Sequence, residues 1–316
     1  MRTRELARLI GTLGKLPRDQ RKMITSELAA MESDASSIDV IESEMPARPD
    51  CPHCASRQVI KHGRCGSLQR YRCRHCSRTF NALTGTPLAH LHLRGKWLDQ
   101  AEALRDGLSL NQVAERLNVA QSTAFRWRHR VLALPQTVQA QSLVGIAEAD
   151  EAYFLRSYKG QRHGLGRAPR KRGGKAKRRG LSAEHVPVLI ARDRTGSTAN
   201  FVLESVTAKE VSTTLRPILP DDTVLCTDGS TSLAAAARHL GVEHHPINVS
   251  AGVRVSGAWH VQNVNAFASR LRAWMTRFKG VATRYLANYL GWFRMLDRSP
   301  GFNPDSAQLL ALALRG

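Results

Sequence analysis

The sequence predicts an α/β protein whose largest domain, residues 140–297, holds a mixed sheet with helices on its faces. Two smaller modules precede that domain, one indicated by four spaced cysteines and one by a pair of short helices. Short apolar runs predict strands at 144–152, 186–193, 198–204 and 223–228. Predicted helices lie at about 207–216, 231–240 and 259–278. The alternation of strand and helix in the second half is typical of a sheet covered by helices.

The composition indicates a partner that carries phosphate. The chain of 316 residues has 47 Lys and Arg against 26 Asp and Glu, a formal net charge of +21 and a pI near 10.7. A positive field of this size favours nucleic acid. The length suggests two or three domains, and a hydrophobic content of 42% is sufficient for a core.

The N-terminus and the hydropathy predict an intracellular, cytoplasmic protein. No apolar run approaches the length of a membrane span, and residues 1–17 have no clear signal-peptide core and cleavage site. The cysteines are therefore expected to be reduced unless they bind metal. Residues 1–49 are expected to form a helical segment, 1–30, followed by a polar and acidic linker, 31–49.

Four cysteines predict a zinc ribbon over residues 50–88. CPHC and CRHC are CxxC pairs separated by 18 residues. Four thiolates in this arrangement hold Zn²⁺ tetrahedrally, and the residues between them alternate enough to form short strands. A disulfide-bonded module is the alternative, but it conflicts with the missing secretion signal. The predicted zinc ligands are Cys51, Cys54, Cys73 and Cys76, and Cys65 and Cys226 are left as ordinary thiols.

Residues 93–134 predict a helix-turn-helix. The helical pattern breaks at Gly107 and again at Asn118, where a left-handed turn residue is tolerated. The inward face is predicted to comprise Leu110, Val113, Ala114, Leu117, Val119, Ala124, Trp127 and Val131. The residues expected to point outward are Gln121, Ser122, Arg126, Arg128 and Arg130. In a major groove the first three are candidate base readers, and the other arginines are candidate phosphate contacts. A purely structural helical bundle is the alternative.

The most basic segment, 156–179, interrupts the large domain. It contains eleven Lys and Arg and no acidic residue, and its glycines make packing into a core improbable on composition. A nuclear-localisation signal is the usual alternative interpretation of such a run. A loop that follows DNA phosphates fits better, because the segment lies inside the domain with the candidate metal ligands. Its candidate DNA contacts are Arg170, Lys171, Arg172, Lys175, Lys177, Arg178 and Arg179.

Two aspartates and one asparagine are candidate ligands for a divalent cation. Asp150 and Asp228 each follow a short apolar run, and Asn265 lies on a predicted helix with Arg272 on the same face, seven residues on. Mg²⁺ or Mn²⁺ prefers oxygen ligands and keeps positions open for phosphate oxygens. An Asp before Gly at a strand end is also a common turn former. Asp228 alone therefore does not decide between a metal ligand and a turn.

The third ligand has to be neutral if a helix supplies it. Between Asp228 and Asp297 the only acidic residue is Glu243, which lies off the predicted helix. Asn265 offers one carbonyl oxygen, so the second metal is expected to bind weakly until DNA phosphate adds charge. Glu148, on the same strand face as Asp150, is the reserve carboxylate.

Together these motifs resemble the transposases of bacterial insertion sequences, in particular the zinc-ribbon group called insertion-sequence family 1595. The resemblance runs from Cys51 to about Asp297 and includes LCTDGS, GVRVSGAWHVQNVN and NYLGWFR. It implies a catalytic domain of the ribonuclease-H-like, retroviral-integrase-like fold, with Asp150 and Asp228 as metal ligands. The third catalytic position, glutamate in most such enzymes, falls on Asn265, and some members are similar in using asparagine there.

The resemblance also implies an activity and its partners. It implies a DNA transposase that binds terminal inverted repeats, cuts at the element's ends and joins the freed 3′-hydroxyls to target double-stranded DNA. A structural Zn²⁺, a catalytic Mg²⁺ or Mn²⁺, and a dimer or larger assembly on DNA in the bacterial nucleoid are expected. Arg272 stands where the family has lysine, and Ala268 stands where a larger polar residue is expected.

Two other functions remain open from the sequence. One is a DNA-binding regulator with an inactive catalytic domain, and the other is a nuclease of the same fold that cuts without joining. The C-terminal tail, 298–316, predicts only a short helix in SAQLLALAL.

Overall fold

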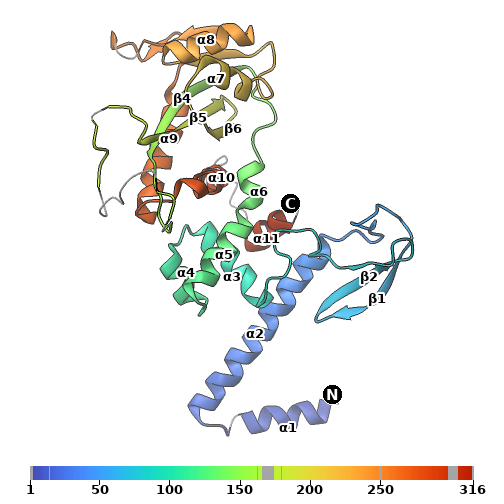
Figure 1. Ribbon diagram of the computed structural model, residues 1–316. Helices are drawn as coiled ribbons and strands as arrows, with labels where there is room; N and C mark the ends of the chain where they lie inside the picture. Colours follow the sequence, from blue (N-terminus) through green and yellow to red (C-terminus); the bar gives the residue numbers. More distant parts are fainter. Residues whose placement is uncertain are drawn as a thin grey trace. The chain divides into compact units, whose positions relative to one another are not determined.

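The computed structural model describes residues 3–13, 15–161, 163–165, 174–178, 180–248, 251–297 and 305–314. The chain divides into two compact units. The first comprises Met1–Arg130 together with Pro304–Gly316, and the second comprises Val131–Asn303. Figure 1 shows the elements of both units along the chain.

The first unit contains mostly helices and one small sheet. Its helices are α1 (Thr3–Leu13), α2 (Arg18–Ser43), the 3₁₀ turn η1 (Arg94–Lys96), α3 (Trp97–Arg105), α4 (Leu110–Arg116), α5 (Gln121–Val131, which ends one residue beyond the unit) and α11 (Ser306–Leu314). Its strands are β1 (Val59–Cys65), β2 (Leu68–Cys73) and β3 (Thr79–Phe80). The strands form one antiparallel sheet in the order β1-β2-β3.

Helix α2 corrects the prediction of a linker from residue 31. It continues to Ser43, because its C-terminal half has apolar residues on the face that packs against η1, α3 and α11. Ile38 and Ile41 on this face are buried. The Oε1 of Glu42 accepts a hydrogen bond from the backbone N–H of Gln69 at 2.5 Å, which ties the end of the helix to β2. Tertiary packing thus outweighs the polar composition.

Helices α4 and α5, called the helix pair below, are joined by a short turn. Ser109 and Gln112 form a capping box at the start of α4. Asn118 in the turn has φ of +48°, the left-handed conformation that the sequence predicted there. Val113 and Trp127 are buried on the inner face. The tail helix predicted after residue 298 is α11, which packs against α2 and α3.

The second unit is a five-stranded mixed sheet with helices on both faces. Its strands are β4 (Ile146–Leu155), β5 (His185–Asp193), β6 (Thr198–Val202), β7 (Val224–Thr227) and β8 (Glu243–Pro246), with a separate hairpin of β9 (Val255–Ser256) and β10 (Trp259–His260). Its helices are α6 (Ala133–Thr137), α7 (Ala208–Leu215), α8 (Thr231–Leu240), α9 (Gln262–Met275), η3 (Thr276–Phe278), η4 (Thr283–Tyr285) and α10 (Leu286–Leu296). The four strands and three helices predicted for this domain are confirmed, with small shifts at their ends.

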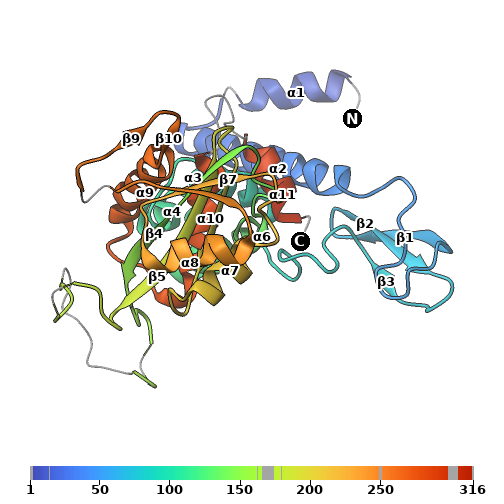
Figure 2. The same cartoon turned by 90° about the horizontal axis from the view of Figure 1, so that it is seen from above.

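The sheet order is β6-β5-β4-β7-β8, and β5 alone runs opposite to its neighbours among these strands. Alternating residues of β4 face opposite sides. Ala147 and Ala149 belong to the apolar core with residues of α7 and α8. Glu148 contacts α9 on the other face, where α9 and α10 also pack against strands. Figure 2 shows the helices on either side of the strands.

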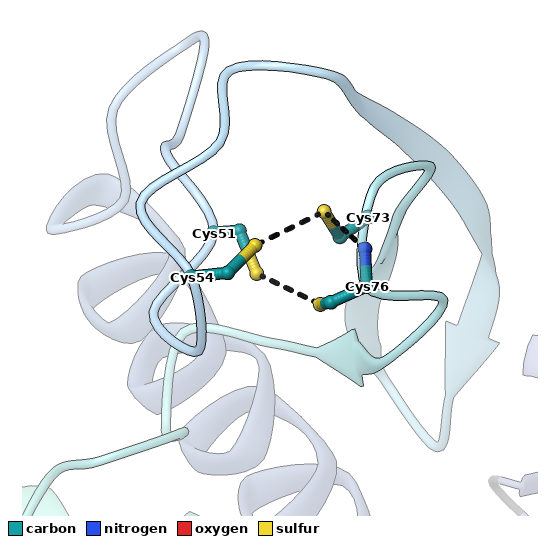
Figure 3. Close-up of side chains that lie close together, drawn as sticks. All are labelled: Cys51, Cys54, Cys73 and Cys76. Atoms are coloured by element: carbon teal, nitrogen blue, oxygen red, sulfur yellow. Dashed lines mark hydrogen bonds between the residues drawn. The ribbon is translucent and has the colours of Figure 1, made fainter.

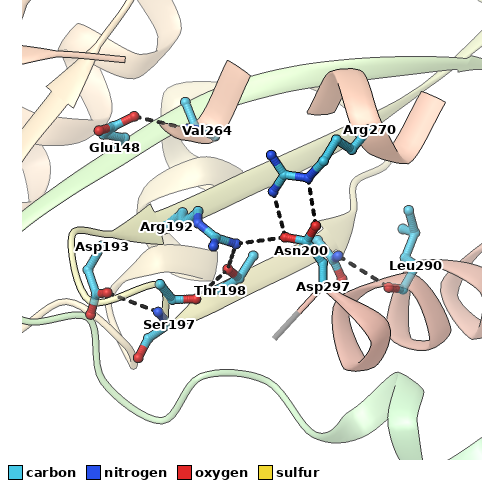
Figure 4. A network of polar contacts seen from close by, with 11 residues as sticks. Glu148, Arg192, Asp193, Ser197, Thr198, Asn200, Val264, Arg270, Leu290 and Asp297 are labelled. Atoms are coloured by element: carbon cyan, nitrogen blue, oxygen red, sulfur yellow. Dashed lines mark hydrogen bonds and ion pairs between the residues drawn. The ribbon is translucent and has the colours of Figure 1, made fainter. Parts of the chain in front are cut away.

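A polar network fixes α9 and α10 on the sheet (Figure 4). The guanidinium of Arg270 on α9 donates two hydrogen bonds of 2.7 Å to the carboxylate of Asp297, at the end of α10. Arg192 on β5 lies 3.2 Å from the same carboxylate and also donates to Thr198 on β6. Charge-assisted, two-pronged contacts of this kind fix geometry as well as adding stability.

The start of the second unit is fastened by the buried Arg294 of α10. Its guanidinium donates to the backbone oxygens of Pro135 and Val138 at 2.7 Å each. Gly291 allows α10 to approach α6 closely, because a Cβ there would lie 2.4 Å from the oxygen of Pro135. None of the helices that the structure describes is long and apolar enough to cross a membrane.

Candidate metal centres and catalytic site

Four thiols converge in the first unit and form the cysteine cluster: Cys51, Cys54, Cys73 and Cys76. Their sulfurs all lie within 4.8 Å of one another, with Cys51 and Cys76 at 3.6 Å and Cys54 and Cys73 at 3.7 Å. Figure 3 shows the two CxxC turns facing each other. A tetrahedral Zn²⁺ site with Zn–S bonds of 2.3 Å requires sulfurs about 3.8 Å apart. The donor set and its dimensions therefore fit zinc.

Backbone N–H groups point at these sulfurs. The N–H of Cys76 donates to the sulfur of Cys73 at 3.5 Å, and that of His53 donates to Cys51 at 3.4 Å. The N–H of Cys76, followed by that of His75, stabilises the thiolate and lowers the pKa of Cys73 to about 6. The second turn thus favours the thiolate of Cys73, the form that binds metal. Without an ion in the cluster, the N–H of Ser56 is outweighed by burial and by the three neighbouring thiols, which raise the pKa of Cys54 to about 12. Cys65 and Cys226 lie outside the cluster.

Asp150 and Asp228 meet in the second unit because of strand register. Parallel strands β4 and β7 pair Ala149 with Thr227, and β7 ends there. The next residue on each strand is the aspartate, so the two carboxylates are neighbours at the open carboxyl end of β7. This is the edge at which ligands bind in open α/β sheets. The sequence-predicted pair is therefore brought together.

Glu151 joins them, and together the three form the carboxylate cluster. A carboxylate oxygen from each of Asp150, Glu151 and Asp228 lies within 4.8 Å of the others. Asp150 leaves β4 on the α9 face and Glu151 on the α8 face, where it hydrogen-bonds Ser230, the N-cap of α8. Because β7 ends beside Asp150 and Glu151, no further residue of β7 lies between their side chains. The carboxylate cluster therefore includes side chains from both faces of the sheet.

The prediction from sequence missed Glu151. Adjacent strand residues point to opposite faces, so Asp150 and Glu151 would not both serve one site in the middle of a sheet. The signal that could have found it is the early end of the neighbouring strand, since Asp228 is followed by Gly229 with φ of +80°. A DE pair beside a strand that ends in Asp-Gly indicates two carboxylates that can turn toward the same edge.

Burial and the charge of Asp228 raise the pKa values of Glu151 and Asp150. Desolvation comes first for Glu151, followed by the charges of Asp228 and Asp150, and its pKa rises to about 7. The pKa of Asp150 is also raised, chiefly by burial and by Asp228, against the opposing effects of the Glu151 N–H and Arg272. Closely spaced carboxylate oxygens whose negative charges repel one another are a suitable ligand set for a hard divalent cation.

Asp228 is both a turn former and a member of the cluster. Its Oδ1 accepts a hydrogen bond of 2.9 Å from the backbone N–H of Ser230. This Asx turn uses one oxygen of the carboxylate and leads directly into α8. The two roles that the sequence left open for Asp228 therefore coexist.

Asn265 and Arg272 lie on the exposed side of α9. Seven residues separate them, so they share one face of the helix, and the charge of Arg272 is close enough to lower the pKa of Asp150. Arg272 therefore lies near Asp150 of the carboxylate cluster. Ala268 is buried, which makes it part of the packing of α9 at a position where a larger polar residue was expected.

Glu148 does not serve as a reserve carboxylate in this arrangement. It is buried, and both its oxygens are already engaged by donors of the protein. Its side chain faces the N-terminal end of α9, because the even-numbered positions of β4 point to that layer. Glu151, and not Glu148, is the additional carboxylate beside Asp150.

The candidate DNA-reading residues of α5 are exposed, with one exception. Gln121, Ser122, Arg126 and Arg130 are exposed as expected, and Gln121 hydrogen-bonds Asn111. Arg128 is buried, and it donates to the backbone oxygen of Leu108 at 2.7 Å. The predicted outward orientation of Arg128 is therefore wrong. Helical periodicity explains it, since positions 124, 127, 128 and 131 form one face.

Four of the candidate DNA contacts in the basic segment lie outside the described residues, namely Arg170, Lys171, Arg172 and Arg179. Lys175, Lys177 and Arg178 are described and exposed. The backbone N–H of Lys177 donates to the carboxylate of Glu184 at 2.6 Å. Between 156 and 184, the residues that the structure describes form neither helix nor strand.

Residues 142–294 match the family described as the ISXO2-like transposase domain. A protein of Halobacterium salinarum, described as an uncharacterized protein in transposable element ISH50, is 29% identical over 258 residues, covering 79% of this chain and 87% of the relative. Among solved structures, a pre-cleavage Mos1 transpososome is 14% identical over 69% of this chain and 74% of that chain, with a TM-score of 0.29. The Mos1 strand transfer complex is 14% identical over 69% and 75%, with a TM-score of 0.31. The carboxylate cluster and Asn265 lie inside the matched segment 142–294.

Proposed function

We propose that this chain, whose residues 142–294 match the ISXO2-like transposase domain, binds the terminal inverted repeats of an insertion sequence and catalyses metal-dependent cleavage and strand transfer there. The observation that carries the proposal is the carboxylate cluster at the middle of β4 and the carboxyl end of β7, inside the matched segment. An insertion-sequence DNA transposase needs a metal centre beside a surface that binds phosphates, and the cluster meets the first need.

The catalytic domain is ribonuclease-H-like in this proposal. The sheet order supports it, with three antiparallel strands, β4 to β6, followed by two strands that join parallel to β4 on its other side. The central strand of the sheet then supplies Asp150, and the first of the added strands supplies Asp228. This topology delivers two acids from distant parts of the chain to one edge.

Asp150, Asp228 and Asn265 would hold Mg²⁺ or Mn²⁺, and Glu151 adds a third carboxylate. When bound, a pair of such cations activates water or a 3′-hydroxyl and stabilises the charge on the attacking and leaving oxygens. Two aspartates alone would leave much of the positive charge of two cations uncompensated. The carboxylate of Glu151 would add a third negative charge, so that binding of the second cation would depend less on DNA phosphate.

Arg272 and Asn265 orient the DNA and the ligands in this proposal. Arg272 is exposed and places a positive charge near Asp150, where it would bind a phosphate oxygen of the DNA end. A planar guanidinium binds a phosphate with two parallel hydrogen bonds, which fixes its orientation more tightly than an ammonium group would. Asn265 contributes a neutral oxygen from the same helix face.

DNA binding involves three other surfaces in this proposal. The helix pair reads the inverted repeat through Gln121, Ser122 and Arg126, beside the zinc ribbon formed around the cysteine cluster. Arg130 and the basic segment, 156–179, contact phosphates. With a net charge of +21, much of the affinity is electrostatic and independent of sequence. Since two element ends must be joined, the protein acts on double-stranded DNA as a dimer or larger assembly.

A joining assay on labelled inverted-repeat duplexes with Mg²⁺ tests the proposal. Asp150→Ala and Asp228→Ala should abolish both cleavage and joining while end binding stays within experimental error of the parent. Glu243→Gln is the matched control, because Glu243 is an exposed carboxylate of β8 outside the cluster. Full activity in either alanine variant would refute the metal-centre assignment.

The same assay separates the other candidate functions. Cleavage without joining would favour a nuclease of this fold. Specific end binding with neither reaction, in Mg²⁺ and in Mn²⁺, would favour a DNA-binding regulator with an inactive catalytic domain.

A further inference from the structure

Glu148 occupies an unusual position for a carboxylate. It is the third residue of the central strand β4, two residues before Asp150, and it is 0% exposed. Its Oε2 accepts a hydrogen bond of 2.9 Å from the backbone N–H of Val264, and its Oε1 accepts one of 3.0 Å from the side-chain amide of Asn263. Figure 4 shows the contact between Glu148 and Val264. A buried charge is tolerated only with such partners.

The contact with Val264 completes the start of α9. The first N–H groups of a helix lack partners within the helix, and a polar side chain just before it usually accepts one of them. The residue at that position is Val261, which has no side chain able to do so. Glu148 of β4 takes this role instead, and its negative charge lies at the positive end of the helix dipole.

Two further side chains surround the same carboxylate. The Nε of Arg194, just after β5, and the Nδ1 of His260, on β10, each lie 3.3 Å from its Oε1. Arg194 also donates to the backbone oxygen of Ala258 at 3.1 Å and contacts the ring of His260. Four segments therefore meet at one carboxylate: β4, the turn after β5, the β9–β10 hairpin and α9.

We propose that Glu148 is a positioning residue that sets where α9 lies along β4, and thereby where Asn265 and Arg272 lie relative to Asp150. This inference rests on the proposed function. On α9, the partners of Glu148 are Asn263 and Val264, which immediately precede Asn265. On β4, Glu148 lies two residues before Asp150. The hydrogen bonds of Glu148 therefore join β4 and α9 next to the residues that each contributes to the proposed metal centre. The rest of α9 is held separately by Arg270 and Asp297, which leaves Glu148 to fix the N-terminal end.

The expected effect is on chemistry rather than on binding. A displacement of about 1 Å at a reacting group can cost on the order of 100-fold in rate. Glu148 does not touch the carboxylate cluster's ligand set, since its own oxygens are occupied by α9 and its neighbours. Loss of the contact should therefore lower the rate of strand transfer while leaving the affinity for divalent cations and for DNA ends nearly unchanged.

The test uses an exchange of partners in the full-length protein. Glu148→Gln should lower the rate of strand transfer at saturating DNA by about 10- to 100-fold. Adding Asn263→Asp returns one carboxylate and one amide to the same two positions, and should recover most of that loss. Mn²⁺ binding, measured by electron paramagnetic resonance, should change less than about threefold in both variants. Hydrogen exchange of the first turn of α9 should be faster in Glu148→Gln and slower again in the double variant.

Asp150→Asn is the comparison for a true ligand, and it should lose Mn²⁺ binding and activity together. If Glu148→Gln weakens Mn²⁺ binding as strongly as Asp150→Asn does, Glu148 is a ligand and the proposal is wrong. Unchanged strand transfer in Glu148→Gln, or no recovery in the double variant, would also overturn it. Should Glu148→Gln not fold, as judged by circular dichroism, Asn263→Ala removes one contact only and should give a smaller loss of the same kind, again without loss of Mn²⁺. Full activity of Asp150→Asn would refute the proposed function instead, independently of Glu148.

Discussion

The cysteine cluster and the carboxylate cluster are both candidate metal centres, yet they are built in opposite ways. Each pair of thiols comes from a single CxxC turn, and the two turns flank one small sheet. The carboxylates come from β4 and from the end of β7, which are far apart in sequence and adjacent only through sheet pairing. The first centre is local in sequence, and the second depends on the whole domain.

The surroundings of the two clusters differ as well. Backbone N–H groups donate to the sulfurs of Cys51 and Cys73. Around the carboxylates, by contrast, burial first and then the charge of Asp228 raise the pKa values of Asp150 and Glu151. The core beneath the cysteine cluster is small, built on Cys51, Cys73 and Phe80, whereas the acids stand on a sheet with its own extensive core. Metal is thus expected to stabilise the fold at the first centre and to serve chemistry at the second.

Removing zinc should produce the largest effect. Structural zinc binds zinc-finger peptides with about 10–16 kcal/mol of apparent free energy, most of which is folding free energy. A zinc chelator, or Cys51→Ser, should therefore unfold residues 50–88, seen as complete loss of amide protection by hydrogen exchange. Protection of β4 and β7 should persist. Metal analysis of the untreated protein should give one zinc per chain.

Cys65→Ser is the matched control, since Cys65 is an exposed thiol on the same strand system but outside the cluster. It should retain zinc and protection. A chelated protein that keeps its amide protection over 50–88 would show that zinc contributes nothing to this fold.

The contrast also explains what the sequence could predict. The cysteine cluster was found complete, because CxxC spacing alone fixes which sulfurs meet. Asp150 and Asp228 were found because each follows a short apolar run that forms a strand. Glu151 was missed, because its approach to Asp150 depends on where the neighbouring strand ends, which is a tertiary fact. Glu148 was misjudged for a related reason, since only the packing of α9 shows that its carboxylate is already used.

Changing the ligands of the second centre should produce an intermediate effect. Asn265→Ala should reduce cleavage and joining by about 10- to 100-fold, the loss typical of groups that support a metal site without contributing a negative charge to it. Asn265→Asp should retain partial activity with a shifted preference between Mg²⁺ and Mn²⁺, because it adds charge without changing reach. Glu151→Gln should raise the Mg²⁺ concentration needed for half-maximal joining. Titrating Mg²⁺ and Mn²⁺ in the joining assay measures all three effects.

A double variant makes the comparison sharper. Glu151→Gln with Asn265→Asp keeps three carboxylates near the centre but moves one of them to α9. Its Mg²⁺ requirement should return toward that of the parent. Full activity of Asn265→Ala would mean that Asn265 is not a ligand, and an unchanged Mg²⁺ requirement in Glu151→Gln would exclude Glu151 from the centre.

Arg128 and α2 show a second limit of the sequence. The inward positions of α5 were predicted from spacing, and the same spacing includes position 128, but the charge of Arg128 argued for an outward side chain. In the structure its guanidinium points inward and donates to the backbone oxygen of Leu108 at 2.7 Å. For α2, acidic composition suggested a linker, whereas Ile38 and Ile41 are buried against other elements. In both places tertiary contacts decide against a compositional argument.

The smallest expected effect has the opposite sign to zinc removal. Burial, then Asp228 and Asp150, raises the pKa of Glu151 to about 7 in the folded protein without divalent cations at the centre, above its ordinary value of 4.5. The folded state therefore holds this proton more tightly than the unfolded state, so stability falls as pH rises from about 4.5 to about 7 and stays reduced above that.

Glu151→Gln should remove this loss of stability. At pH 8, in buffer without Mg²⁺ and with the bound zinc retained, its Tm should exceed that of the parent by about 2–4 °C, a modest shift because solvent screens the partly exposed group. At pH 4 the two should melt together, and Mg²⁺ should stabilise the parent more than the variant. Glu243→Gln, which changes an exposed carboxylate elsewhere, should show none of these differences. If Glu151→Gln lowers the Tm at pH 8 without Mg²⁺, the carboxylate cluster is not strained by its own charge, and the contrast with the cysteine cluster fails at that point.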